Sequence, residues 1–83
     1  MTDDWLNHKD AFMTIDCRGV TADMLPAILF SARKAKVGGG LHVIQEFEPK
    51  ELYGPLEELG FEYKLIRVSD NEYHAYFHRL EIP

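Results

Sequence analysis

The chain contains a single thiol, Cys17, and a cysteine thiolate is a strong nucleophile that can carry sulfur. Arg18 lies next to it, and a predicted helix begins a few residues later; a positive charge and a helix N-terminus both favour the thiolate form. A buried free cysteine behaves instead as a small hydrophobic residue. The alternation of side chains near Cys17 does not decide between these positions, so a sulfur relay and a core position are both open.

The loop after this cysteine is the second candidate site. Residues 16–19 lead into the predicted helix, where free backbone N–H groups can hold an anion. Arg18 would add positive charge there, whereas Asp16 and Asp23 would oppose an anion. A plain strand-to-helix turn is the other interpretation, with a glycine for its backbone freedom and Thr21 or Asp23 as the helix cap. We expect a protein partner or a small ligand to contact this loop through Asp16, Arg18, Gly19, Thr21 and Asp23.

Four histidines could bind metal or move protons: His8, His42, His74 and His78. His74 and His78 share a face of one predicted strand, but four residues of strand separate them by about 13 Å, too far for one metal ion. A His42–His74 or a His42–His78 pair would form if their strands are neighbours. Histidines on a sheet surface without a ligand are the simpler interpretation, and we expect no metal and no cofactor.

Six glutamates make the region around the second predicted helix acidic: Glu46, Glu48, Glu51, Glu57, Glu58 and Glu62. Acid–base catalysis needs two carboxylates with separated pKa values, and nothing in this spacing selects such a pair. The acidic region is therefore interpreted as a solvated face, which could also dock a basic partner. The three glycines at 38–40 lack the flanking residues of a phosphate-binding loop and indicate the end of a helix.

Length and charge limit the classes of function. The 83 residues hold one domain, and the 46% hydrophobic content excludes a disordered tail. Nine basic against fourteen acidic residues give a net charge of −5, which argues against nucleic-acid and anionic-membrane binding. One cysteine excludes an internal disulfide framework and a multi-cysteine zinc site. The sequence shows no secretory signal and no apolar run that could span a bilayer, so we expect a cytoplasmic protein.

Hydrophobic periodicity predicts six elements that position these residues. Strands are expected over 11–16, 41–47, 62–68 and 73–80, with helices over 22–36 and 49–59. The second helix should be broken at Gly54-Pro55, and Gly60 should follow its end. Residues 1–10 are predicted to be a lead-in, held by Trp5 and Leu6, and residues 11–83 a single domain. The βαβαββ order predicts an α+β two-layer sandwich, with both helices on one face of a four-stranded mixed sheet.

The other face of this sheet has no helix to cover it. We expect it to carry His42, Ile44, Tyr63, Leu65, Tyr76 and Phe77. A solvated face with scattered aromatic residues is one interpretation. An interface is the other, since large exposed apolar patches usually mark contacts, and a homodimer through this face would be one form of it.

The residues of the first strand and both helices resemble the TusA/SirA-like sulfur-carrier superfamily. The resemblance rests on the strand that ends Ile15-Asp16 and continues to Gly19, on the proline-bearing helix after it, and on the Leu-Tyr-Gly-Pro-Leu-Glu-Glu-Leu-Gly-Phe segment at 52–61. That segment is similar to TusA-related domains of unknown function. The resemblance covers about residues 11–80 and implies the same βαβαββ sandwich.

The sulfur carriers of this superfamily use a Cys-Pro-x-Pro motif whose cysteine lies six residues after the strand aspartate. Counting from Asp16 places Ala22 there, and Pro26 falls one residue late. The resemblance therefore implies a non-catalytic accessory or binding protein, linked to sulfur or redox metabolism. A persulfide carrier that uses Cys17 is the alternative. A loose likeness of the fold to the C-terminal domain of a translation initiation factor raises nucleic-acid binding, which the net charge disfavours.

Overall fold

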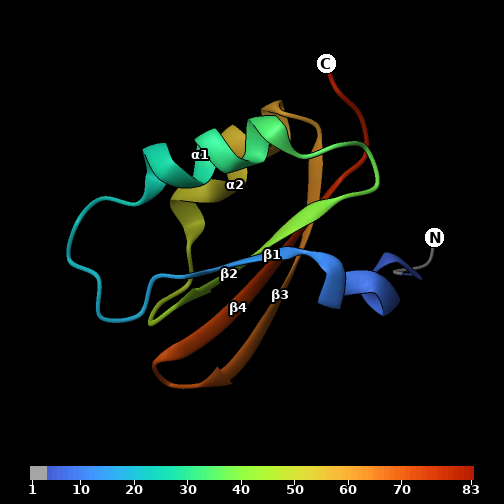
Figure 1. Cartoon of the computed structure of the whole chain (residues 1–83). Helices are drawn as coiled ribbons and strands as arrows, with labels where there is room; N and C mark the ends of the chain where they lie inside the picture. The colour runs from blue at the N-terminus through green and yellow to red at the C-terminus, as the bar shows by residue number, and fades with distance from the viewer. Residues whose placement is uncertain (1–3) are drawn as a thin grey trace.

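A computed structural model describes residues 4–83 of the chain as a two-layer α+β sandwich (Figure 1). This confirms the predicted fold class and order of elements. The elements are η1 (Asp4–Ala11), β1 (Met13–Asp16), α1 (Leu25–Lys34), β2 (Gly40–Gln45), α2 (Lys50–Glu58), β3 (Phe61–Ser69) and β4 (Glu72–Arg79). None of the helices formed by residues 4–83 is long and apolar enough to cross a membrane.

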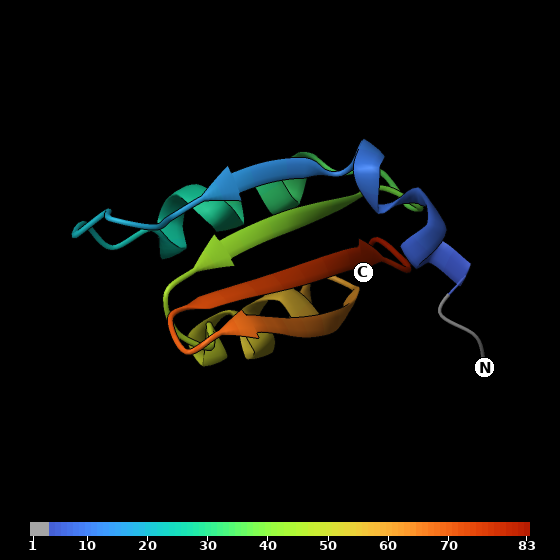
Figure 2. The ribbon, with the colours of Figure 1, turned by 90° about the horizontal axis from the view of Figure 1, so that it is seen from below.

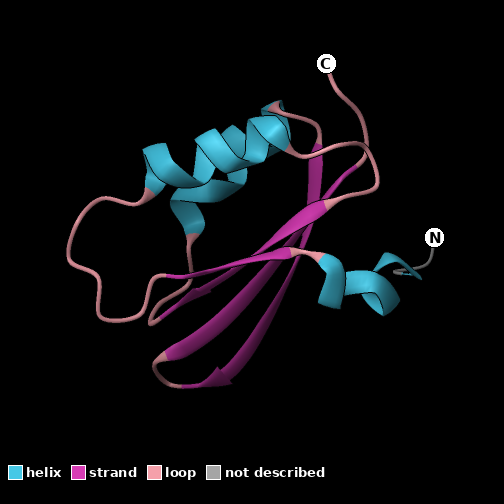
Figure 3. Ribbon diagram, in the orientation of Figure 1, coloured by secondary structure: helices cyan, strands magenta, loops and turns pink. Residues whose placement is uncertain are grey.

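The four strands form one mixed sheet in the order β1-β2-β4-β3 (Figure 2). β1 runs parallel to β2, whereas β2 pairs antiparallel with β4, and β4 forms a hairpin with β3. Both α-helices lie on the same face of this sheet (Figure 3). The hairpin turn at Asp70 and Asn71 falls between the strands that were predicted over 62–68 and 73–80.

The hydrophobic core fills the space between the helices and the sheet. It contains Ile28 and Ala32 from α1 and Leu52 and Leu56 from α2. These face sheet residues that include Leu41, Val43, Ala75 and Phe77. Phe61, at the start of β3, and Cys17, just after β1, complete the buried cluster. The core positions on α1 and α2 follow the helical spacing from which the two helices were predicted.

The break expected at Gly54-Pro55 is wrong, because α2 runs through both residues. A proline inside a helix costs about 3 kcal/mol. Leu52 and Leu56 flank it, four residues apart, and are 1% and 0% exposed. Burying each of these leucines contributes about 1.5–3 kcal/mol, enough to offset the proline. Gly60 follows the helix with φ +93°, as predicted, and a side chain there would clash with the carbonyl of Glu81.

Arg79 is a buried cation that the sequence did not reveal as a structural residue. It lies at the end of β4, is 3% exposed, and its acceptors among residues 4–83 are backbone carbonyls. Its Nη1 lies 3.1, 3.3 and 2.8 Å from the carbonyl oxygens of Ala32, Arg33 and Ala35 at the end of α1. Its Nε donates to the carbonyls of Leu59 and Glu81. Arg79 therefore joins the C-terminal ends of both helices to the sheet.

The face without α-helices carries fewer apolar residues than expected. Side chains alternate along β4, so Tyr76 lies on this face while Phe77 points into the core at 1% exposure. Tyr63 and Leu65 also lie on the helix side: Tyr63 stacks on Tyr53 of α2, and Leu65 packs against the core. The predictions that Phe77, Tyr63 and Leu65 lie on the open face were therefore wrong.

The described part of the lead-in packs on this open face. Residues 4–11 form η1, and the Trp5 ring stacks on His78 at 5.0 Å, with Phe12 6.0 Å from Trp5. The expectation that Trp5 holds this segment is confirmed. Residues 1–3 of the predicted lead-in lie outside the described range.

Candidate functional site

Asp16 and Arg18 form a bidentate ion pair at the end of β1. Arg18 Nη2 lies 2.7 Å from Asp16 Oδ2, and Arg18 Nε lies 3.0 Å from Oδ1. The backbone N–H of Arg18 donates to the same Oδ1. The pKa of Asp16 is lowered to about 2, mainly by the bond from the Arg18 side chain and then by the bond from the Arg18 backbone N–H. The carboxylate stays charged over the ordinary pH range and holds the guanidinium in one orientation.

Glu72 connects this pair to β4. Its Oε1 lies 3.3 Å from Nη1 of Arg18, and its Oε2 lies 2.7 Å from Nε2 of His74. The bond to His74 is the main reason that the pKa of Glu72 lies below its ordinary value, and Arg18 adds to the effect. Arg18 thus lies between two carboxylates that come from different strands.

A chain of hydrogen bonds continues from Glu72 across the open sheet face. His74 Nδ1 lies 2.7 Å from His42 Nε2, and His42 Nδ1 lies 3.2 Å from Thr14 Oγ1. The His42–His74 pair considered from the sequence is therefore formed, because β2 and β4 are neighbours. A carboxylate only accepts, so His74 Nε2 donates to Glu72. With both rings neutral, His42 then donates to His74 and Thr14 donates to His42.

Ring stacking holds this histidine pair in place. The Tyr76 ring lies 4.3 Å from the His42 ring at 13°, and the two histidine rings are 4.9 Å apart. Burial lowers the pKa of His42 below its ordinary value of 6.5, and the charge of His74 lowers it further. A positive charge on His42 beside a charged His74 would place two like charges 2.7 Å apart, so this neighbour acts in the same direction as burial.

The remaining predicted loop residues have separate roles. Gly19 has φ +77°, a conformation that favours glycine, and its N–H donates to Oε1 of Glu46 at 3.3 Å. Asp23 accepts the backbone N–H of Leu25 at 3.0 Å, but the N-cap of α1 is Met24, so the expected cap at Thr21 or Asp23 is wrong. Thr21 is exposed on the loop. The structure brings Asp16 and Arg18 together, while Thr21 and Asp23 lie further along the loop.

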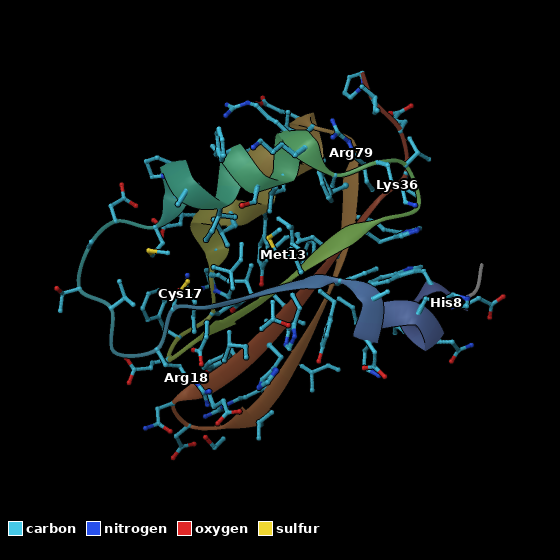
Figure 4. All side chains as sticks on the ribbon, in the orientation of Figure 1. His8, Met13, Cys17, Arg18, Lys36 and Arg79 are labelled. Carbon is cyan, nitrogen blue, oxygen red and sulfur yellow. The ribbon has the colours of Figure 1, made fainter. Side chains whose placement is uncertain are left out.

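Cys17 lies beneath this loop, on the helix side of the sheet (Figure 4). It is 8% exposed, and burial raises the pKa of its thiol, although a hydrogen bond from Gln45 acts in the other direction. The thiol borders a hollow of about 80 Å³, with Asp23 and Gln45 in the same wall. The side-chain oxygen of Gln45 is buried without a hydrogen-bond partner among the described residues.

The sequence analysis missed Glu72 and Gln45, and it placed Tyr76 on the open face without its stacking on His42. Glu72, His74 and Tyr76 alternate on one strand, so their common face could have been recognised. Their partners on β1 and β2 could at best be named as alternatives, as for His42, but not decided. Gln45 shares its face with Leu41 and Val43, and a polar residue on the core side of a strand was the available signal. Among residues 4–83, no group of three or more metal-ligating side chains could hold a metal ion.

Compared with known proteins, the chain matches no family model, no curated protein and no solved structure.

Proposed function

We propose that this chain is a non-catalytic TusA-like binding protein whose contact surface is the loop from Asp16 to Asp23. The main observation in support is the difference in exposure between the side chains of this loop and the thiol beneath it. Arg18 keeps 43% of its side chain exposed and Val20 is 45% exposed, whereas Cys17 is 8% exposed with a raised thiol pKa. The loop therefore offers a charged and an apolar group for contact, but no accessible thiolate.

The arrangement of the loop supports a role in contact. Asp16 and Glu72 hold the Arg18 guanidinium from two sides, which reduces the side-chain entropy that binding would otherwise cost. Phe47, which is 59% exposed, borders the same hollow as Val20. The position of the carrier cysteine in the resembling superfamily is occupied by Ala22, which is exposed and unreactive. We propose the TusA-like assignment on this scaffold and on the sequence resemblance.

Photo-crosslinking from single positions tests the contact surface. A photoreactive phenylalanine analogue replaces Val20 in one variant and Val37 in the matched control. Val37 is 52% exposed and lies in the turn before β2. We expect one defined crosslinked species in cells from position 20 and none from position 37. Adding Arg18→Ala should remove that species. Equal capture from both positions, or no capture from position 20, would contradict the proposal.

The alternative function is a persulfide carrier that uses Cys17. This function is supported by the hollow that Cys17 borders at the loop. The burial of the thiol and its raised pKa argue against the function. Incubation with a cysteine desulfurase and cysteine, followed by intact-mass measurement, separates the two functions. A gain of one sulfur atom that is lost in Cys17→Ala would favour the carrier.

We also propose that any homodimer forms at the β3 side of the open face. Ile44 and Tyr76 are only 7% and 8% exposed there, whereas Ile66 is 41% exposed. Ile66 pairs with His74 and so belongs to this face. Sedimentation velocity of the unmodified protein and of Ile66→Lys tests it: a dimer should dissociate in the variant.

A further inference from the structure

A groove of about 570 Å³ lies between the second half of α2, the start of β3 and the segment after β4. We call it the α2–β3 groove, and its lining includes Tyr53, Gly54, Glu57, Glu62, Tyr63 and Glu81. Its volume falls within the range of about 300–1,000 Å³ that is usual for binding sites. Its lining includes the start of β3 and the segment after β4, and these lie away from the loop that follows β1 (Figure 1).

An aromatic wall forms one side of this groove. The Tyr53 and Tyr63 rings stack at 3.9 Å with an angle of 10° between them. The Tyr53 hydroxyl donates to Glu48 at 3.0 Å, which fixes its ring on α2. Tyr63 nevertheless stays 47% exposed, because only part of its surface is covered by Tyr53 and the core. A rigid, half-exposed aromatic ring thus faces solvent at the groove.

Acidic side chains surround this wall, and none of the residues that line the groove is Lys, Arg or His. Glu57 and Glu81 are exposed, one on α2 and the other after β4. Glu62 is also in the lining, but its carboxylate is engaged by Nδ1 of His78 at 2.7 Å. The groove therefore favours a cation and repels phosphates and other anions.

We propose that the α2–β3 groove binds an arginine side chain presented by a partner polypeptide. A guanidinium is planar, so it can stack on Tyr63 while its paired N–H groups bind the carboxylate of Glu57 or Glu81. A lysine ammonium is a compact, strongly hydrated charge and lacks this planar fit. The site lies outside the loop proposed above as the contact surface and is independent of it.

Gly54 allows the groove to be blocked. A Cβ atom added at Gly54 would meet nothing within 4 Å, so a larger side chain there can enter the groove without displacing the core. Gly54→Phe is the blocking variant. Gly54→Ala is the matched control, because it shares the cost of a Cβ atom directly before Pro55 in the helix but adds only a methyl group at the groove. Glu57→Gln is a second variant, which removes charge from an exposed position and keeps the shape.

The test is a titration of the isotopically labelled protein with short blocked peptides that contain one arginine or one lysine, followed by amide NMR. We expect the arginine peptide to shift the amides of Gly54, Glu57 and Tyr63 and to bind several-fold more tightly than the lysine peptide. Gly54→Phe should weaken arginine binding by about tenfold or more, whereas Gly54→Ala should keep it. Glu57→Gln should weaken it and reduce its dependence on salt.

Three results would overturn the proposal. One is the absence of shifts at the groove at saturating arginine peptide. Another is equal binding of the arginine and lysine peptides, and the third is unchanged binding in both Gly54→Phe and Glu57→Gln. None of these results affects crosslinking from position 20, so failure here and failure of the proposed contact loop are distinguishable.

Discussion

The Nε2 atom of His42 lies 2.7 Å from the Nδ1 atom of His74, and this bond joins two strands that are far apart in the sequence. It places Thr14, the two histidines, Glu72, Arg18 and Asp16 in one continuous polar row. The row runs from the open sheet face to the loop after β1. Charge changes at one end are therefore coupled to the groups at the other.

Protein stability should fall as the pH is lowered through the range in which histidine titrates. Burial lowers the pKa of His42 below 6.5, so the unfolded chain binds this proton more readily than the folded one. As the pH falls, the resulting loss of stability begins near the pKa of His42 in the unfolded chain. It is complete below the pKa of His42 in the folded protein. Urea unfolding at about pH 7.5 and about pH 5.5 measures it, since this interval spans the ordinary histidine pKa.

His42→Gln is the comparison for this pH effect. The variant lacks the titrating ring, so its free energy of unfolding should change less between the two pH values. The slope with pH is compared rather than the absolute stability, since the substitution also removes the stacking on Tyr76. An unchanged slope would show that His42 does not carry the effect.

Removing Arg18 should raise the pKa of Asp16 from about 2 toward 3.8. The pKa of Glu72 should rise less, because its main partner, His74, is retained. In the unmodified protein, the stabilising effect of the charged Asp16 is present above pH 3.8 and is lost as the pH falls toward 2. NMR titration of the side-chain carboxyl carbons in Arg18→Gln measures both values. Arg67→Gln is the control, because Arg67 pairs with Asp70 and should leave Asp16 at about 2.

Arg79→Met should destabilise the domain by about 3 kcal/mol or more, because the charged donor to five carbonyls disappears and some of those carbonyls stay buried. The methionine retains part of the packing on Phe61, whose ring lies 5.3 Å from the guanidinium carbon. Urea unfolding measures the loss. The exposed Arg67→Met should change stability little, since surface ion pairs contribute little. Similar stabilities for the two variants would refute the role of Arg79.

The Cys17 thiol should react slowly in the folded protein. It is 8% exposed, and burial raises its pKa, so both access and the thiolate fraction are reduced. The rate with dithionitrobenzoate at mildly alkaline pH measures this, with the same protein in denaturant as the reference. We expect a many-fold faster reaction after unfolding. Equal rates in the two conditions would mean that the thiol is accessible and would favour the carrier function.

The order and type of the elements could be read from the sequence because they depend on local patterns. The apolar residues of α1 and α2 recur at helical spacing, and strand residues alternate, which was enough for the α+β sandwich. Gly60 was correctly placed because the end of a helix depends on the conformation of a few neighbouring residues. The cap expected at Thr21 or Asp23 was wrong, because α1 begins later than predicted, with Met24 as its N-cap. The break at Pro55 was wrong because the burial of Leu52 and Leu56 is a tertiary effect.

The candidate site was predicted only in part. Asp16 and Arg18 could be selected from their places in the loop, since an ion pair two residues apart is local. Whether Cys17 is buried, and whether His42 meets His74 or His78, depends on which strands become neighbours and in which register. Arg79 shows the same limit, because its acceptors come from chain segments up to 47 residues away. The sequence by itself thus determined the elements, whereas the tertiary structure decided which side chains share an environment, because strand pairing and core packing are set by contacts between distant residues.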